Sequence, residues 1–290
     1  MRRAGGPTSM LIAQISDLHI GFERCHPDEP NLRRLNHVLD RILALDPLPD
    51  LLIASGDLTE SGDQESYDVL ARALARCPMP VHVMAGNHDL RGPLTDAFPD
   101  TPSPGGFLQQ VIEGDGLRLI LLDTLELGRH GGGYCDVRAA WLAETLAAAP
   151  AEPTLIFLHH PPQSVGIPWM DPSPTEPWIA LLERTLAQHR QIVAITTGHV
   201  HRATHTTWAG FPLIVCPSTA PEVSLVLTPI DADHPDGRAL IEDGDPGFAL
   251  HDWRDGRLTT LFGGCPPTTL ARFNDALQPM IASMLAERQG

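Results

Sequence analysis

Short apolar runs alternate with longer amphipathic stretches along most of this chain. The runs are rich in Leu, Ile and Val, and the stretches between them repeat apolar residues at helical spacing. Strands are predicted at 10–15, 51–55, 80–84, 117–122, 154–158, 192–196 and 212–216, with a final strand pair near 247–251 and 257–262. Helices are predicted at 31–45, 63–76, 137–148, 176–189 and 268–287. This alternation is typical of an α/β fold whose largely parallel strands are buried on both faces.

Several segments break the alternation. Pro and Gly crowd residues 100–107 and 160–177, and long loops of this kind in a compact domain usually form the rim of a site. Residues 228–247 are acidic and rich in Gly and Pro, which indicates a surface excursion. We expect residues 1–9 to be a disordered extension, with Met10 as an alternative start. Residues 263–290 should form a C-terminal helical segment whose apolar stripe packs on the body or on a partner subunit, so we expect a homo-oligomer.

Charge and cysteine content narrow the functional classes. The formal net charge is −16, all 20 basic residues are Arg, and Lys is absent. A strongly acidic surface repels a long nucleic acid, and the lack of Lys excludes a Schiff base or a P-loop. The five Cys are scattered and form no CxxC pair, which argues against a disulfide framework or a thiolate metal site. No apolar run reaches membrane-spanning length and no signal peptide is recognisable, so we expect a cytoplasmic protein without a membrane partner.

Polar side chains of metal-binding type directly follow five of the predicted strands. They are Asp17 and His19 in "SDLH", Asp57 in "SGD", Asn87, His88 and Asp89 in "GNHD", His159 and His160 in "HHPP", and His199 and His201 in "GHVH". The carboxyl ends of parallel strands meet at one edge of a sheet, so we expect these groups to lie together. Residues two apart in extended chain point to the same side, which would pair Asp17 with His19 and His199 with His201.

The composition of these clusters suits two metal ions. Without His88, His160 and Asp89 the set contains two carboxylates, one amide and four imidazoles. Seven groups are too many for one tetrahedral ion with an open position, and they suit two ions that share a bridging carboxylate. Nitrogen and oxygen ligands without thiolate favour Mn, Fe, Zn or Co, as a divalent or mixed-valence pair. Two such ions can clamp and polarise a phosphoryl group.

The motifs "ISDLH", "SGDLT", "AGNHD", "LHHPP" and "GHVH", in this order, resemble those of the calcineurin-like metallophosphoesterase superfamily. The segments "IFLHHPPQSVGIPWMDP" and "CPSTAPEV" resemble its branch of class III cyclic nucleotide phosphodiesterases and glycerophosphodiesterases. The resemblance implies a catalytic domain over 10–262, with an αββα sandwich of two mixed sheets flanked by helices. It implies that Asp17, His19 and His201 hold one ion, that Asn87, His159 and His199 hold the other, that Asp57 bridges them, and that His88 faces the substrate phosphate.

The implied activity is hydrolysis of a small phosphodiester by attack of a metal-bridging hydroxide on phosphorus. Two divalent ions with two carboxylates and a hydroxide leave about one net positive charge, which matches a monoanionic diester. Only Arg could assist a dianionic monoester, and Arg91 and Arg202 lie just outside the motifs. Three alternatives remain open at this point: a phosphomonoesterase or nucleotide pyrophosphatase with the same site, a nuclease, and a non-catalytic scaffold.

Structural roles, or a choice between a structural and a pocket role, are expected for the remaining polar residues. Structural roles are expected for His26, His37, His82, His130, His189, His234 and His251. We expect His160 to pack behind the ligands and Asp89 to orient His88 or cap its turn, and a structural role for His205 is favoured over substrate contact. Trp169, Met170 and Asp171 either line a substrate pocket or pack within their loop. The pocket walls should come from loops 21–30, 160–177 and 217–224.

Overall fold

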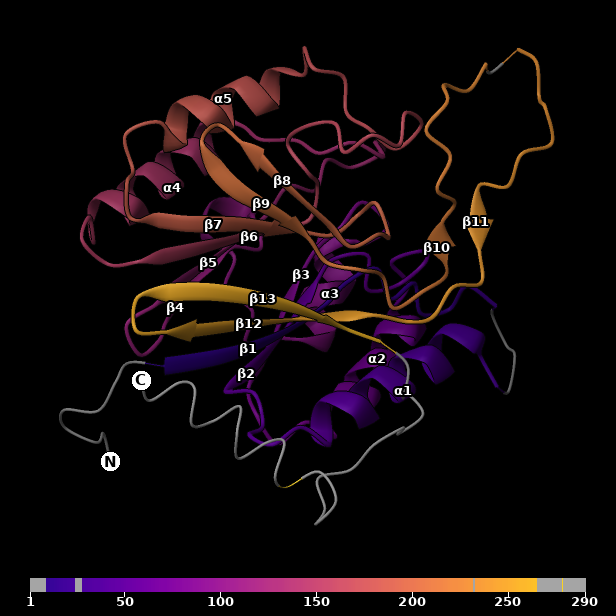
Figure 1. The fold of residues 1–290 in the computed structure, drawn as a ribbon, viewed down its shortest axis with the longest axis horizontal. Helices are drawn as coiled ribbons and strands as arrows, with labels where there is room; N and C mark the ends of the chain where they lie inside the picture. Colours follow the sequence, from indigo (N-terminus) through magenta and orange to yellow (C-terminus); the bar gives the residue numbers. More distant parts are fainter. Residues whose placement is uncertain (1–8, 24–27, 232, 265–277, 279–290) are drawn as a thin grey trace.

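The secondary-structure elements stack as helix, sheet, sheet, helix (Figure 1). The computed structural model describes residues 9–23, 28–231, 233–264 and 278. One sheet has the strand order β13–β12–β1–β2–β3, and the other has the order β4–β5–β6–β7–β9–β8. A separate ribbon pairs β10 with β11. The fold is therefore the αββα sandwich of two mixed sheets that the resemblance implied.

The first sheet is formed by both ends of the domain. Its strands are β1 (Ser9–Ile15), β2 (Leu51–Ser55), β3 (Val81–Met84), β12 (Phe248–Arg254) and β13 (Arg257–Gly263). The outer layer on this sheet contains α1 (Pro30–Leu43), α2 (Gln64–Leu74) and α3 (Arg91–Ala97). The strands β1, β2 and β3 run parallel, whereas β12 is antiparallel to β1 and β13.

The second sheet is formed by the middle of the chain. Its strands are β4 (Gln110–Glu113), β5 (Arg118–Leu122), β6 (Thr154–Leu158), β7 (Ile192–Thr197), β8 (Thr204–Trp208) and β9 (Phe211–Val215). The outer layer contains α4 (Asp136–Ala147) and α5 (Pro177–Leu186). A short 3-10 helix (Pro104–Gly106) precedes β4, and the ribbon consists of β10 (Glu222–Val223) and β11 (Ile241–Glu242). The antiparallel strands β4 and β8 flank a parallel centre.

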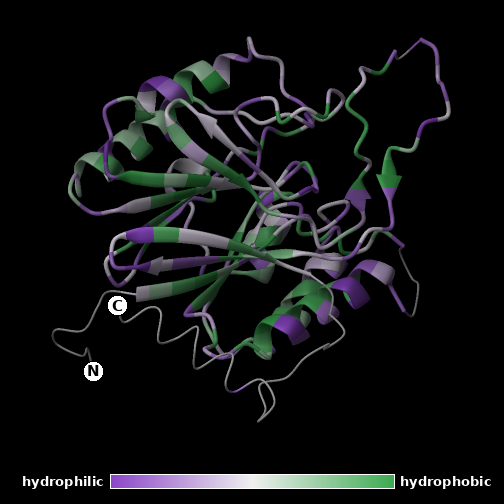
Figure 2. Ribbon diagram, in the orientation of Figure 1, coloured by the Kyte–Doolittle hydropathy of each residue, from purple (hydrophilic) through white to green (hydrophobic). Residues whose placement is uncertain are grey.

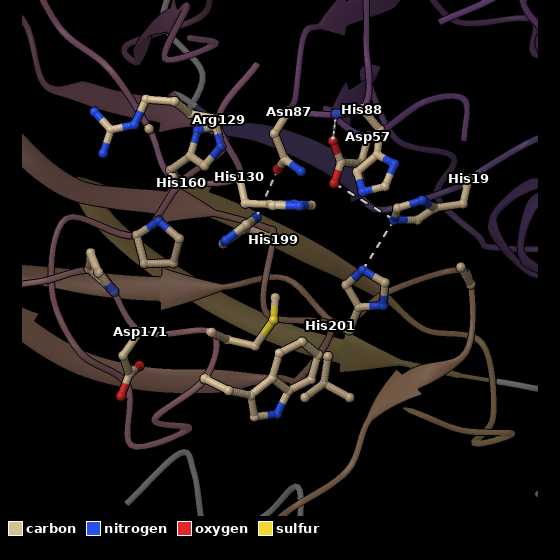
Figure 3. A pocket seen from close by; sticks show the side chains of 18 of the residues that line it. His19, Asp57, Asn87, His88, Arg129, His130, His160, Asp171, His199 and His201 are labelled. Atoms are coloured by element: carbon tan, nitrogen blue, oxygen red, sulfur yellow. Dashed lines mark hydrogen bonds and ion pairs between the residues drawn. The ribbon is translucent and has the colours of Figure 1, made fainter. Parts of the chain in front are cut away.

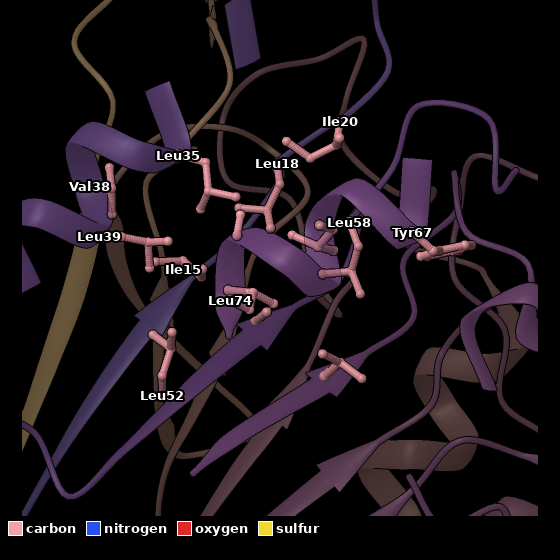
Figure 4. Close-up of a cluster of buried hydrophobic side chains, with 14 of the residues drawn as sticks. Ile15, Leu18, Ile20, Leu35, Val38, Leu39, Leu52, Leu58, Tyr67 and Leu74 are labelled. Atoms are coloured by element: carbon pink, nitrogen blue, oxygen red, sulfur yellow. The ribbon is translucent and has the colours of Figure 1, made fainter. Parts of the chain in front are cut away.

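Alternation of side chains explains why the strands read as continuous apolar runs. In β1, Ala13 and Ile15 pack against α1 and α2, whereas Met10 and Ile12 pack between the two sheets. Figure 4 shows the first of these clusters, in which residues of α1 and α2 cover the sheet. Figure 2 shows apolar residues along the strands of both sheets and a mixture of polar and apolar residues on α1. Strands buried on both faces need apolar residues at every position, as the sequence pattern indicated.

Several elements were absent from the sequence prediction. The strands β4 and β8 lie at sheet edges, and β8 alternates between exposed and partly buried polar residues, so neither has the apolar run of a central strand. The helix α3 has only seven residues and contains Gly92 and Pro93. The helices predicted to end at 45 and 189 end at Leu43 and Leu186. Apart from residue 278, the predicted helix 268–287 lies outside the described residues, as does the predicted extension 1–9 apart from Ser9.

None of the helices in the described ranges is both long and apolar enough to cross a bilayer.

A buried carboxylate fixes the loop that follows β5. Asp123 is fully buried and accepts two hydrogen bonds from the Arg91 guanidinium, at 2.7 and 2.8 Å. It also accepts hydrogen bonds from the backbone N–H groups of Leu108 and Leu125. The paired geometry is strong and directional. Through these bonds, α3 of the first layer is tied to the end of β5 in the second sheet.

Replacing Asp123 by Ala should therefore destabilise the fold. The Asp123→Ala variant leaves the Arg91 guanidinium and two buried N–H groups without their acceptor, and we expect a loss of about 3 kcal/mol in the free energy of unfolding. Urea denaturation followed by circular dichroism measures this. The matched control is Asp96→Ala, because Asp96 is exposed on α3, and it should change stability by less than about 0.5 kcal/mol. Equal losses of unfolding free energy in Asp123→Ala and Asp96→Ala would contradict the structural role of Asp123.

Candidate metal centre

The predicted ligands are presented by backbone in an unusual conformation. Positive φ values occur at seven described residues other than Gly, and five of them are predicted ligands: Asp17 (54°), His19 (46°), Asp57 (47°), His199 (73°) and His201 (55°). The expectation of extended backbone at the two pairs is therefore wrong. Left-handed backbone costs an L-residue of order 1–3 kcal/mol and persists only where surrounding contacts impose it.

Backbone hydrogen bonds between neighbouring loops impose that conformation. The N–H of Asp17 donates to the carbonyl of Gly56, and the N–H groups of Leu18 and His19 both donate to the carbonyl of Asp57. The loops after β1 and β2 are thus joined side by side. The ligand side chains on these loops meet because each loop turns sharply through left-handed residues. The two-residue spacing in the sequence does not bring them together by itself.

Glycine makes room for the closest approach in the site. A Cβ placed on Gly86 would lie 2.3 Å from both the backbone N and the Oδ1 of Asp57. A Cβ on Gly56 would lie 2.4 Å from Nδ1 of His159, and Gly56 has a φ of +102°. Both distances are shorter than any side chain tolerates. The geometry of the site therefore requires glycine at both positions.

One group of predicted ligands comes from β1 and β7. The Nε2 atoms of His19 and His201 lie 3.2 Å apart, and Nε2 of His201 lies 3.5 Å from Oδ1 of Asp17. One ligand atom from each of the three residues falls within 4.8 Å of the others. Asp17 is fully buried, and its carboxylate accepts a hydrogen bond from the backbone N–H of His199 at 3.0 Å. These residues are the three that the resemblance assigned to the first ion.

The second group comes from β3, β6 and β7. Nδ1 of His199 lies 3.0 Å from Oδ1 of Asn87, and the rings of His159 and His199 have centroids 5.4 Å apart. Asp57 lies between the two groups, because its Oδ2 is 3.7 Å from Nε2 of His19 and 3.3 Å from Nε2 of His159. All seven predicted ligands therefore converge, with Asp57 between the two groups. Figure 3 shows His19, Asp57, Asn87, His199 and His201 among the side chains that line the pocket.

Hydrogen bonds to carbonyl groups fix the imidazole tautomers. Nδ1 of His159 donates to the carbonyl of Ser55 at 2.9 Å, and Nδ1 of His201 donates to the carbonyl of Pro221 at 2.7 Å. A carbonyl only accepts, so Nε2 of each neutral ring carries a lone pair that faces the cluster. Nε2 of His159 is buried and forms no hydrogen bond with the described residues. Rings held in this way, beside buried carboxylates, fit the requirements of bound metal ions.

Electrostatics in the centre favour a positive charge. Burial lowers the pKa of His159, but the charges of Asp57 and Asp17 outweigh that effect and raise the pKa to about 9. Burial raises the pKa of Asp57, and the charged His159 beside it holds that pKa well below its ordinary value. Burial and the charge of His159 together lower the pKa of His199 to about 3. A metal ion must displace the proton of His159, so metal binding is expected to weaken as the pH falls.

His88 lies beside the cluster and is held by Glu60. Its backbone N–H donates to Oδ1 of Asp57 at 2.8 Å, and its Nδ1 donates to the carbonyl of Glu60 at 2.9 Å. The carboxylate of Glu60 accepts from Nδ1 of His19 at 2.8 Å. Glu60 was missed by the sequence analysis, although it stands three residues after Asp57. Its position could have been suspected, because a ligand histidine commonly donates its second N–H to a carboxylate.

Asp89 caps the turn and does not contact the ligand atoms. Its buried carboxylate accepts from the N–H groups of Leu58, Thr59 and Gly86 and from the hydroxyl of Tyr67. Burial and the nearby charge of Asp57 raise the pKa of Asp89 to about 6. Asp89 thus joins the loops after β2 and β3, which is the second of its two expected roles.

A pocket of about 690 Å³ opens onto this cluster. It lies in the size range of small-molecule sites. The expected loops contribute Phe22, Trp169, Met170, Asp171 and Pro221, so Trp169, Met170 and Asp171 do line the pocket.

The loop after β5 provides another wall that the sequence analysis missed, with Arg129, His130, Gly131 and Gly132. Arg129 is the one arginine among the described lining residues. The structural role expected for His130 is therefore incomplete, because this residue also lines the pocket. His130 stands in a Gly-rich stretch outside the five motifs, so the sequence did not indicate that it lines the pocket.

Other residues near the motifs have different surroundings. His160 is buried and its Nδ1 lies 2.9 Å from Oγ1 of Thr124, while the ring also borders the pocket. His205 is exposed on β8 and does not line the pocket. Arg202 bonds to the carbonyl of Val223 and pairs with Glu222. Arg91 is paired with Asp123. Neither Arg91 nor Arg202, the two arginines beside the motifs, lines the pocket.

Comparison with known proteins agrees with this geometry. The profile of the calcineurin-like phosphoesterase family matches residues 10–203. A probable glycerophosphodiester phosphodiesterase of Arcobacter nitrofigilis is 31% identical over 250 residues, which cover 85% of this chain and 89% of that protein. A probable cyclic nucleotide phosphodiesterase of Rhodopseudomonas palustris is 32% identical over 245 residues, which cover 76% of this chain and 88% of that protein.

Solved structures support the fold. A dimetal phosphatase from Danio rerio superposes with a TM-score of 0.57 at 15% identity, covering 90% of this chain and 100% of that one. The family match covers the five motifs as far as His201, and the buried His and Asp clusters agree with a dinuclear metal site. The chain belongs to the calcineurin-like phosphoesterase family.

Proposed function

We propose that this chain is a metal-dependent phosphodiesterase that hydrolyses small phosphodiesters, such as cyclic nucleotides or glycerophosphodiesters. The observation that carries the proposal is the placement of the Asp57 carboxylate within 3.7 Å of His19 and 3.3 Å of His159, between two sets of buried or half-buried ligands. Relatives about 30% identical are named for both kinds of diester, which supports this substrate class.

The ligands divide between two ions. Asp17, His19 and His201 would hold the first ion, Asn87, His159 and His199 would hold the second, and Asp57, which lies between the two sets, would serve both. The set offers imidazole nitrogens and carboxylate or amide oxygens, and Cys77, Cys135 and Cys216 are not among the described lining residues. This chemistry favours Mn, Fe, Zn or Co. When bound, such a pair activates a water molecule and neutralises charge on the phosphoryl oxygens.

The protein groups around the centre orient the reacting phosphate. His88 is fixed by its Nδ1–H···O=C bond to Glu60, so its Nε2 is free for the substrate. In its protonated form it stabilises charge on the phosphate or donates to the leaving oxygen. Asn87 would contribute a neutral oxygen, and the second ion would therefore be held more weakly than the first. The backbone bonds between the loops keep these groups in place before substrate arrives.

Charge in the pocket supports a diester. A site with about one net positive charge suits a monoanion. The single described arginine in the lining, Arg129, is paired with Glu176 at 2.8 Å. A dianionic monoester therefore meets no unpaired guanidinium among the described lining residues. The acidic chain, with a net charge of −16, also disfavours a long nucleic acid.

Two synthetic esters test the proposal. We expect the protein reconstituted with Mn²⁺ to hydrolyse bis(p-nitrophenyl) phosphate faster than p-nitrophenyl phosphate, because the site is matched to a monoanion. Chelated protein should hydrolyse neither. Release of p-nitrophenol gives kcat/KM directly. A preference for the monoester would favour the phosphatase or pyrophosphatase alternative, and absence of turnover by metal-loaded protein would contradict the proposal.

Asp57→Ala should lower the metal content at both sites, because one carboxylate serves both ions. The measurement is metal stoichiometry by elemental analysis after reconstitution and gel filtration. The matched control is His205→Ala, a change at an exposed position of β8 outside the pocket, which should retain the wild-type metal content. Two full equivalents of metal in Asp57→Ala would refute the bridging role.

His88→Ala should reduce kcat by about 10²–10⁴-fold, since general acid help of this kind is lost. The metal content should stay at the wild-type value, because His88 is placed toward the substrate and outside both ligand sets. Steady-state kinetics and elemental analysis on the same sample separate the two effects. Loss of metal from this variant would instead make His88 a ligand.

A further inference from the structure

A cysteine stands at the start of α4, outside the residues that line the pocket. Cys135 is the N-cap residue of this 12-residue helix, with extended backbone at a φ of −124° and a ψ of 170°. Ser, Thr, Asp or Asn is usual at this position, because a side-chain oxygen accepts hydrogen bonds from the unpaired N–H groups of the first turn. Cys135 is half-buried, and α4 has no side-chain cap. A neutral thiol is a weak acceptor, so it serves these N–H groups poorly.

A buried guanidinium stands beside the sulfur, on the first turn of the same helix. Arg138 is 2% exposed, and its Nε is buried and forms no hydrogen bond with the described residues. Its Nη1 donates to the carbonyls of Asp123 and Leu125, at 3.2 Å each, and its Cζ lies 4.4 Å from the centre of the Phe107 ring. These contacts hold the guanidinium in place but leave Nε without an acceptor. A buried donor without an acceptor is costly, so this position favours a negatively charged neighbour.

These donors favour the charged form of the Cys135 sulfur. Burial raises the pKa of the thiol, but hydrogen bonds from the backbone N–H and the side chain of Arg138, the charge of that side chain and the N–H of Val137 outweigh burial and lower the pKa. A thiolate at the N-cap also lies at the positive end of the helix dipole. It gives the first turn of α4 the acceptor that a neutral thiol does not provide.

The other titratable groups around the sulfur do not cancel this effect. Asp136 is exposed, and the carboxylate of Glu126 is 48% exposed and lies 3.5 Å from Nη2 of Arg138. Solvent screens both carboxylates, whereas the guanidinium is buried. Burial raises the pKa of Tyr134, so its hydroxyl stays neutral. The net electrostatic effect at Cys135 is therefore positive.

The other two described cysteines have the opposite electrostatics. Cys77 is half-buried like Cys135, but burial raises its pKa and outweighs the charge of Arg76. Cys216 is fully buried, and burial together with the charge of Asp17 raises its pKa well above the ordinary value. Both remain protonated thiols near neutral pH. They provide internal controls for the behaviour of Cys135.

We infer that Cys135 is a reactive thiolate and a site of oxidation by hydroperoxides. The sulfur attacks one oxygen of hydrogen peroxide, an S–O bond forms, the O–O bond breaks, and the products are a sulfenic acid and hydroxide. Sulfur loses two electrons and the peroxide gains them. The site stands three residues after Gly132, at the end of the loop that lines the pocket. The inference goes beyond the proposed function, and its test requires no turnover of a phosphodiester.

Alkylation rates of the full-length, Mn²⁺-reconstituted protein test the thiolate. Iodoacetamide is added, and labelling is measured by mass spectrometry after digestion with trypsin, which cleaves after Arg and places each of the five cysteines in its own peptide. At pH 7, Cys135 should react at least about tenfold faster than Cys77 or Cys216, because the thiolate is the nucleophile. Its rate should also reach half of its maximum at a lower pH than the rate of Cys77. A Cys135 rate no higher than that of Cys77 would overturn the inference.

A second measurement tests the oxidation and the part of Arg138 in it. Hydrogen peroxide is added together with dimedone, which traps sulfenic acids, and Cys135 should be labelled ahead of Cys77 and Cys216. Arg138→Met removes the guanidinium and should slow both alkylation and trapping at Cys135 by about tenfold. The matched control is Arg184→Met, at an exposed position of α5, which should leave both rates unchanged.

Circular dichroism shows whether Arg138→Met is folded, because its side chain is buried. In a folded variant, unchanged rates at Cys135 would refute the role of the guanidinium. If the variant does not fold, the comparison of the three cysteines within the wild-type protein decides. Equal trapping by dimedone at Cys135, Cys77 and Cys216 would overturn the assignment of Cys135 as the oxidation site.

Discussion

The placement of the two sheets depends on one buried amide. Gln14 of β1 is fully buried and donates to the hydroxyl of Ser55 at 2.8 Å within its own sheet and to the carbonyl of Thr197 in the other sheet at 3.3 Å. Its carbonyl accepts from the hydroxyl of Thr196 at 2.6 Å and from Nε2 of His251 at 2.9 Å. Apolar contact between sheets permits many small displacements, whereas a satisfied polar network specifies one arrangement. Because Asp17 and His199 follow the bonded strands directly, that arrangement also positions the metal centre.

The centre itself is stabilised by backbone contacts that offset its strain. Left-handed residues crowd the loops after β1, β2 and β7, and their N–H and carbonyl groups are bonded to one another across the loops. Asp89 adds a buried carboxylate that accepts hydrogen bonds from the N–H groups of Leu58 and Thr59 after β2, from the N–H of Gly86 after β3 and from the hydroxyl of Tyr67 on α2. The positions of the imidazoles are therefore fixed before any ion binds. Such preorganisation is what a two-metal site needs in order to act on a phosphoryl group without rearrangement.

The pocket is divided into two chemically different halves. One half consists of the family motifs, with buried carboxylates and imidazoles whose tautomers are fixed by carbonyl groups. The other half is formed by loops and by the ribbon, and it combines aromatic and apolar residues with the charged residues Arg129, Asp171 and Glu176. Relatives of this chain are named for different diesters.

The sequence by itself determined the central strands of both sheets, the five motifs and the identity of the seven candidate ligands. Strands buried on both faces can be recognised in an α/β sequence as continuous apolar runs. His and Asp residues that directly follow such strands gather at the edge of the sheet where the strands end. Tertiary structure alone decided how those side chains meet: residues such as Asp17 and His19 converge through left-handed turns imposed by a neighbouring loop, and not through extended backbone. The pocket positions of Arg129 and His130 also emerged only in three dimensions, because the loop after β5 that carries them is held by distant partners such as Asp123 and Arg91. Local periodicity encodes which strands form, whereas the conformation of a loop depends on long-range contacts that no local pattern records.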